Sequence, residues 1–298
     1  PVSTTHSIIG AIIGSSISVY SADVINWERL TDIFASWLIS PLLGAFFAFT
    51  LMCLIFFLIH RRKSPAKSAR FWMPIFFFAT GFSIGLFLLY KLFPAMNMEL
   101  DLSECFIFST IVGAGMAFVN VNTQKNTHSP DIEMHFIPLT IITGCLMAFA
   151  HGANDIANII NPLSIIIHTI NNEASIAQAY NLPILYYFLG SIGIIAGMAT
   201  FGFRVVKTIG NHITTLTPSK AFCASLAASG TVVIATQFGL PVSTTHTLAG
   251  AIIGVGIASG MQSISVRTVK RIIVAWLITL PATSMLAALL IIILPVFI

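Results

Sequence analysis

The sequence predicts an all-α polytopic membrane protein, organised as an inverted-topology repeat with broken helices and re-entrant helical hairpins. Three observations support this prediction: an apolar composition, an internal repeat, and the distribution of basic residues over the loops. Hydrophobic residues make up 56% of the 298 residues and charged residues only 8%, against about 25% charged residues in an average soluble domain. A soluble fold could not bury that much apolar surface, so the expected solvent is the lipid bilayer.

The hexapeptide PVSTTH occurs twice, beginning at Pro1 and again at Pro241. Counted from these two prolines, 11 of the first 14 positions are identical. The correspondence persists downstream, where SWLIS around Trp37 matches AWLIT around Trp276. A repeat at this separation indicates that the chain contains two related halves.

Apolar stretches along the chain predict its helices, and about 20 residues suffice for one crossing of a bilayer. The stretch 136–170 is longer, and we expect one helix with a break near 151–155. The basic loop 60–70 is the expected boundary, with the C-terminal part of the first repeat at 1–59 and the remaining spans, including the second repeat, at 71–298. The predicted stretches are 7–20, 32–59, 71–90, 105–121, 136–170, 184–203, 221–238, 241–258 and 272–298.

Loop charges predict the orientation of these spans, because cytoplasmic loops carry an excess of Lys and Arg. Three loops, 60–70, 204–220 and 259–271, hold 11 of the 14 basic residues and are placed inside. Counting spans backwards places 21–31 outside, and 184–203 is counted as one crossing. The first PVSTTH element then opens outward and the second inward, an inversion typical of secondary transporters.

The second PVSTTH element lies at the turn between two apolar stretches whose outer ends are both inside. Either a re-entrant hairpin or two full spans would satisfy the charges. The polar Ser-Thr-Thr turn favours the hairpin, because such a turn is costly in lipid unless it lines a cavity.

The segment AHGANDIAN, residues 150–158, is the first candidate binding motif. Its Asp155 is the only carboxylate in its apolar stretch, and an Asp near the centre of a membrane helix costs about 2.5–3.5 kcal/mol, so it usually faces a partner or a water-filled cavity. Asn154 and Asn158 share one helix face at i, i+4 spacing. Carboxylate and amide oxygens suit a hard cation such as Na⁺, or a proton. The alternative role is helix bridging by hydrogen bonds.

The two PVSTTH motifs offer hydroxyl groups and no charge. Ser and Thr before a helical run act as N-caps, and a helix N-terminus in a low dielectric attracts anions. Two such elements that face each other from inverted halves predict an oxyanion pocket without Arg or Lys. Ordinary capping at a turn is the alternative for a single copy. The candidate anion-binding residues are Ser3, Thr4, Thr5, Ser243, Thr244 and Thr245.

The histidines allow more than one reading. His6 and His246 close the two motifs, where they either orient the hydroxyls or pack at the turn. His151 and Asp155 stand at i, i+4 spacing, as a metal pair does, but no third ligand accompanies them. We therefore expect no catalytic residues, no cofactor, and no metal other than Na⁺ as a coupling ion. The four cysteines lack metal-type spacing and are expected to be buried thiols.

The GANDIAN segment and the paired PVSTTH motifs resemble the signatures of the inorganic phosphate transporter (PiT) family, over essentially the whole chain and in its bacterial type. In that family each half contains one GAND-type and one PVSTTH-type motif, and phosphate and coupling cations bind between the inverted halves. The resemblance implies phosphate at the six hydroxyl residues and the cation at Asn154, Asp155 and Asn158. The GAND motif of the first half would precede Pro1, so we expect an N-terminally truncated member.

We therefore expect a secondary active transporter in the cell (inner) membrane that carries inorganic phosphate in symport with Na⁺ or H⁺ by alternating access. Its partners would be phosphate, the coupling ion and the lipid bilayer, with no nucleic acid, and assembly into a homo-oligomer is left open. The first alternative is a permease for another oxyanion such as sulfate. A membrane-embedded hydrolase that uses His151 and Asp155, or a receptor-like or structural membrane protein, would be a different class.

Overall fold

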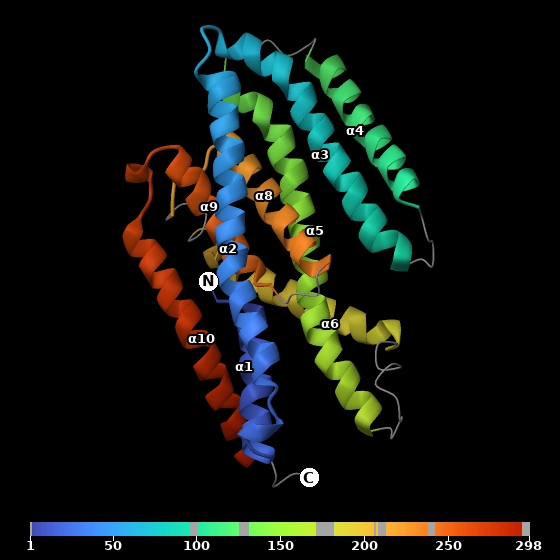
Figure 1. Ribbon diagram of the computed structural model, residues 1–298, viewed down its shortest axis with the longest axis vertical. Coiled ribbons are helices and arrows are strands. Elements are labelled where there is room, and N and C mark those ends of the chain that lie inside the picture. Colours follow the sequence, from blue (N-terminus) through green and yellow to red (C-terminus); the bar gives the residue numbers. More distant parts are fainter. Residues whose placement is uncertain are drawn as a thin grey trace.

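The computed structural model describes residues 2–95, 101–124, 131–170, 182–205, 207, 213–237 and 242–293. The regular elements in these ranges are helices, and Figure 1 shows the long ones running side by side. In chain order they are α1 (Thr4–Val19), η1 (Ala22–Val24), α2 (Trp27–Ile55), η2 (Phe56–His60), α3 (Pro65–Ala95), α4 (Leu102–Gln124), α5 (Ile132–Ile170), α6 (Ile184–Gly197), η4 (Met198–Gly202), α8 (Pro218–Gln237), α9 (Thr244–Ala258), η5 (Met261–Ser263) and α10 (Val266–Ile293).

The two repeated motifs begin equivalent helices in the same way. The Ser3 hydroxyl accepts a hydrogen bond from the backbone N–H of His6 at 3.2 Å and caps α1. The Ser243 hydroxyl accepts one from the N–H of His246, also at 3.2 Å, and caps α9. Each cap satisfies one of the backbone N–H groups that a helix leaves unpaired at its start.

Each motif helix packs against a long helix of the other half: α1 lies along α10, and α9 lies along α2. Gly10 faces Leu280 and Gly14 faces Ser284, so α1 and α10 run in the same direction. Helices α9 and α2 likewise run in the same direction. Because α2 and α10 run in opposite directions (Figure 1), α1 and α9 are antiparallel. The predicted inverted repeat is therefore confirmed.

Helices α8 and α9 form the predicted re-entrant hairpin. The segment that leads into α8 and the segment that leaves α9 lie side by side, since the N–H of Ser265 donates to the carbonyl of Ile213 at 2.9 Å. At the same end of the molecule, the Glu133 carboxylate of α5 accepts two bonds from Ser219, at the start of α8, from its N–H and from its hydroxyl, both at 2.8 Å.

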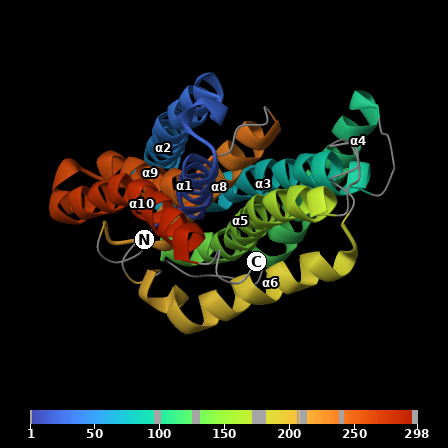
Figure 2. The same ribbon diagram turned by 90° about the horizontal axis from the view of Figure 1, so that it is seen from below.

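Two expectations about individual helices were wrong. Helix α5 is continuous through 151–155. A glycine lowers helix propensity but keeps its backbone N–H, and no proline stands between Pro138 and Pro162 to remove one. The predicted crossing helix at 184–203 instead lies across the long helices as α6 and η4 (Figures 1 and 2).

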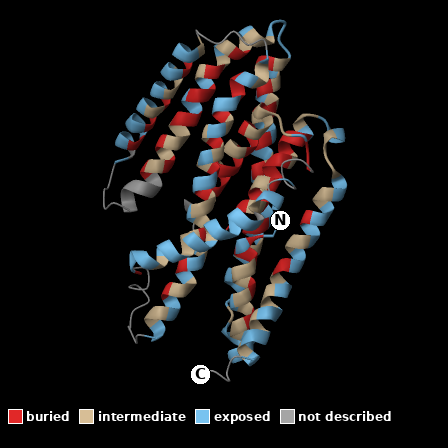
Figure 3. Cartoon of the chain, turned by 180° about the vertical axis from the view of Figure 1, so that it is seen from behind, coloured by how far each residue is buried: buried red, intermediate tan, exposed pale blue. Residues whose placement is uncertain are grey.

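The core lies where α2, α3, α5, α8 and α9 meet, as the buried residues in Figure 3 show. Six of the described helices are long and apolar enough to cross a membrane, and α10 is the least buried of them. Large apolar side chains on its outer face, such as Leu277 and Met285, are more than 70% exposed. This pattern is the one expected of helices surrounded by lipid.

Candidate functional site

Helix α5 brings the Asp155 carboxylate to the first turn of α1. The Thr4 hydroxyl donates to Oδ1 of Asp155 at 3.0 Å, and Nε2 of His151 lies 3.0 Å from Oδ2. Asp155 is only 5% exposed, and a buried carboxylate requires partners of this kind. The bond joins the GAND segment directly to the first PVSTTH motif.

The two asparagines of the GAND segment extend this contact to both motifs. Nδ2 of Asn158 donates to the Thr5 hydroxyl at 3.2 Å, and that hydroxyl donates to the carbonyl of Val242 at 3.3 Å. Nδ2 of Asn154 points to the same carbonyl at 3.5 Å. Val242 belongs to the second PVSTTH motif, so three distant segments of the chain meet here.

The hydroxyl groups of the two motifs have different tasks in this structure. Ser3 and Ser243 act as helix caps, whereas Thr4 and Thr5 bond to side chains of α5. Thr244 is 1% exposed and Thr245 is half-buried, and both lie in the first turn of α9. The hydrogen bonds described for Asp155 go to the first motif and to His151.

The site thus combines one carboxylate, two side-chain amides, hydroxyls and a backbone carbonyl between two helix N-termini. The oxygens are ligands that a hard cation prefers, and the helix starts favour an anion. Within the described residues, no three His, Cys, Asp or Glu side chains are grouped as for a transition metal. The groups at the site are therefore suited to binding ions.

Sequence reasoning left the task of His6 and His246 open and did not connect them with tryptophans. In the structure His6 stacks on Trp37 and His246 on Trp276, next to the site. The signal was present in the sequence, because both the histidines and the tryptophans belong to the repeat.

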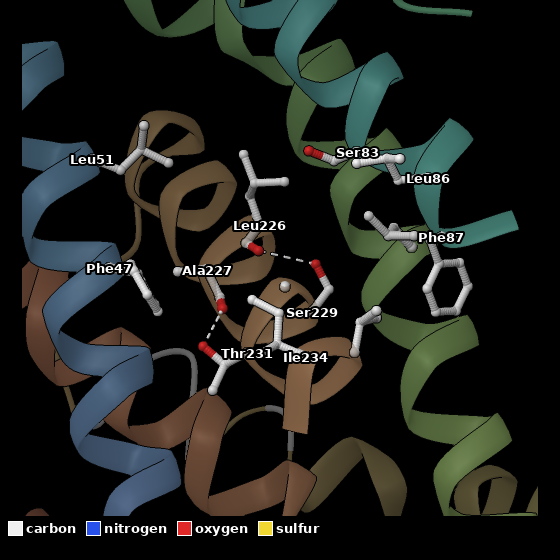
Figure 4. A pocket seen from close by; sticks show the side chains of 13 residues that line it. Phe47, Leu51, Ser83, Leu86, Phe87, Leu226, Ala227, Ser229, Thr231 and Ile234 are labelled. Atoms are coloured by element: carbon white, nitrogen blue, oxygen red, sulfur yellow. Dashed lines mark hydrogen bonds between the residues drawn. The ribbon is translucent and has the colours of Figure 1, made fainter. Parts of the chain in front are cut away.

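A large apolar cavity lies away from this site. It measures about 510 Å³ and lies among apolar side chains of α2, α3, α5 and α8. Figure 4 shows that its Ser229 and Thr231 hydroxyls donate to carbonyls of their own helix, at 3.1 and 2.8 Å. A neighbouring cavity of about 400 Å³ extends from Asp32 along α2 to Val242, at the edge of the site.

Comparisons with known proteins show which family the chain resembles in sequence. The sequence model of the phosphate transporter family matches residues 1–287. A protein of Haemophilus influenzae named as a phosphate permease is 35% identical over 96% of this chain and 70% of its own length. Inorganic phosphate transporter 2-1, chloroplastic, of Arabidopsis thaliana is 32% identical over 96% of this chain and 54% of its own.

A solved structure shows the same fold. The protein titled "The sodium-dependent phosphate transporter" superposes with a TM-score of 0.88 at 31% identity, over 100% of this chain and 74% of that one.

Proposed function

Given that this chain belongs to the phosphate transporter family, we propose that it carries inorganic phosphate in symport with Na⁺ by alternating access to the site between α1, α5 and α9. It is an integral membrane protein, and its family and relatives are transporters and permeases rather than enzymes. The hydrolase that His151 and Asp155 alone would have allowed is thereby excluded.

One observation supports the proposal most: the GAND segment and both PVSTTH motifs are joined by hydrogen bonds at one point. Thr4 bonds to Asp155, and Thr5 bonds both to Asn158 and to the Val242 carbonyl. A substrate held here would contact both inverted halves. Movement of one half against the other could then expose it to either side of the membrane.

Electrostatics explain why a cation should accompany the anion. A phosphate about 6 Å from the Asp155 carboxylate would be repelled by about 3 kcal/mol for each unit charge at an effective dielectric of 20. A Na⁺ ion beside Asp155 would offset this repulsion, and the nearby hydroxyl, amide and carbonyl oxygens can complete its coordination. Neither ion then enters the membrane alone.

The identity of the cation is supported by the solved relative, whose title names a sodium-dependent transporter. A proton is the competing coupling ion, because His151 lies 3.0 Å from Asp155 and is charged only when protonated. The phosphate itself is supported by the family and by the hydroxyl-lined helix starts.

Uptake of radiolabelled phosphate into proteoliposomes tests the proposal. An inward Na⁺ gradient should drive uptake, whereas a choline gradient with an inward proton gradient should not. Excess sulfate should leave uptake unchanged. Asp155→Asn, and separately Thr244→Ala with Thr245→Ala, should abolish accumulation. Proton-driven uptake without Na⁺ would overturn the Na⁺ assignment, and full uptake by both variants would overturn the site.

A further inference from the structure

The two motif helices are fixed to long helices of the opposite half by backbone contact. A Cβ atom added at Gly14 of α1 would lie 2.0 Å from the carbonyl oxygen of Ser284 on α10. One added at Gly254 of α9 would lie 2.2 Å from the carbonyl oxygen of Ala45 on α2. Packing this close does not permit sliding, because side chains cannot yield where backbones touch. The α1–α10 pair and the α2–α9 pair are therefore two stiff units.

Each unit is also closed by a histidine of its motif. Nδ1 of His6 lies 3.3 Å from the carbonyl oxygen of Trp276, within the α1–α10 pair. The His246 ring lies beside the backbone of Trp37, within the α2–α9 pair. A carbonyl only accepts, so Nδ1 of His6 carries the proton of that bond.

Between the two units, the hydrogen bond from the Thr5 hydroxyl to the Val242 carbonyl is accompanied by contacts between aromatic rings. His6 packs on Trp37 with ring centroids 3.7 Å apart and the ring planes tilted by 31°, and His246 stacks on Trp276 at 3.6 Å. The two histidine rings meet edge to face at 4.4 Å. His6 is 6% exposed, His246 3% and Trp37 7%, so these three rings are buried, whereas Trp276 is half-buried. Within the part of the chain that the structure describes, Nε2 of each histidine has no hydrogen-bond partner.

We propose that His6, His246, Trp37 and Trp276 form a ring joint on which the α1–α10 pair and the α2–α9 pair move against each other. Dispersion between stacked faces falls off gradually and has little directionality, whereas hydrogen bonds weaken steeply with angle. The joint can therefore shift while the bonds inside each pair persist. The inference rests on the alternating access proposed above.

The joint is placed to transmit motion to the binding site. His6 follows Thr5 directly, and the Thr5 hydroxyl donates to the Val242 carbonyl just before α9. This bond crosses from one pair to the other, so relative motion of the pairs has to stretch or break it. The four rings thus set how far apart the two hydroxyl motifs stand.

Tryptophan variants test the joint without touching the bonds inside the pairs, because those bonds use the tryptophan backbones. Trp37→Leu with Trp276→Leu should lower the maximal phosphate uptake rate at least about tenfold while the Kd for phosphate stays within about threefold. Phe at both positions keeps a stacking face and should restore most of the rate. Trp72→Leu, a tryptophan outside the joint, is the matched control and should keep its uptake rate. An unchanged rate in the double Leu variant, or loss of phosphate binding together with uptake in a folded protein, would overturn the joint.

A distance measurement separates failure of the joint from failure of the proposed function. Spin labels at Leu38→Cys and Leu277→Cys, in protein whose native cysteines are replaced, report the separation of the two pairs in lipid nanodiscs. We expect two distance populations with Trp at the joint and a changed ratio in the double Leu variant, with or without phosphate and NaCl. Labels at Ile17→Cys and Leu289→Cys, within one pair, should give one constant distance. Identical distributions in both proteins would overturn the joint, whereas absent uptake with this response intact would count only against the transport proposal.

Discussion

The hydroxyl of Thr4 donates a 3.0 Å hydrogen bond to the carboxylate of Asp155, although the two residues are separated by 151 positions. This bond joins the two motifs that the sequence marked as functional. Thr4 itself is exposed while Asp155 is buried, so the pair lies where a buried charge meets an accessible surface. An ion reaching Asp155 would encounter the Thr4 hydroxyl at the same point.

Asp155→Asn should remove the stimulation of phosphate uptake by Na⁺. The amide retains an oxygen for Thr4 but loses the charge that would hold a cation, so we expect uptake to fall by about 100-fold or more. Initial rates at several Na⁺ concentrations measure the effect. Asp23→Asn, an exposed carboxylate outside the site, should keep the normal Na⁺ dependence. A variant at Asp155 that still responds to Na⁺ would show that the cation binds elsewhere.

Asn158→Ala should raise the KM for phosphate more than Asn154→Ala does. Asn158 bonds the Thr5 hydroxyl at 3.2 Å, whereas Asn154 reaches the Val242 carbonyl only at 3.5 Å. Loss of one good hydrogen bond costs about 0.5–1.5 kcal/mol, which corresponds to a change of up to about tenfold. Kinetics of both variants decide the order, and equal KM values would contradict it.

Gly254→Ala should destabilise the protein strongly. The added methyl group would lie 2.2 Å from the Ala45 carbonyl oxygen, so α9 would have to separate from α2. Such overpacking typically costs about 1–3 kcal/mol or more. Gly144→Ala is the matched control, because nothing lies within 4 Å of its Cβ position, and Ala in a helix is favoured over Gly by about 1 kcal/mol. Thermal unfolding in detergent should show a lower Tm for Gly254→Ala alone.

Glu133→Gln should lower stability by weakening the link between α5 and α8. The carboxylate of Glu133 accepts two bonds from Ser219, and hydrogen bonds to charged groups contribute about 1.5–3 kcal/mol each. Gln keeps one acceptor oxygen, so we expect the free energy of unfolding to fall by about 1–2 kcal/mol rather than by the full contribution of both bonds. Thermal unfolding checks this, with Glu28→Gln at the exposed start of α2 as control. An equal Tm for both variants would contradict the role of this link.

Much of the fold was readable from the sequence because membranes impose simple rules. Apolar length predicted the long helices, and loop charge together with the PVSTTH repeat predicted their inversion. The prediction failed for α5, where Gly152 suggested a break that the continuous helix does not have. A glycine lowers helix propensity but does not by itself remove a backbone hydrogen bond, and no proline stands between Pro138 and Pro162.

The sequence by itself determined which groups could bind ions: Asp155, its asparagine neighbours and the repeated hydroxyls all stand out as polar residues in apolar sequence. Only the tertiary structure decided which of them meet. Contacts such as Thr5 with Val242 arise because α1 and α9 each pack against a long helix of the other half. The same packing brings His6 and His246 together. The spacing of residues in a sequence shows which side chains share a helix face. Which two helices come close depends on packing between segments that are far apart in the sequence.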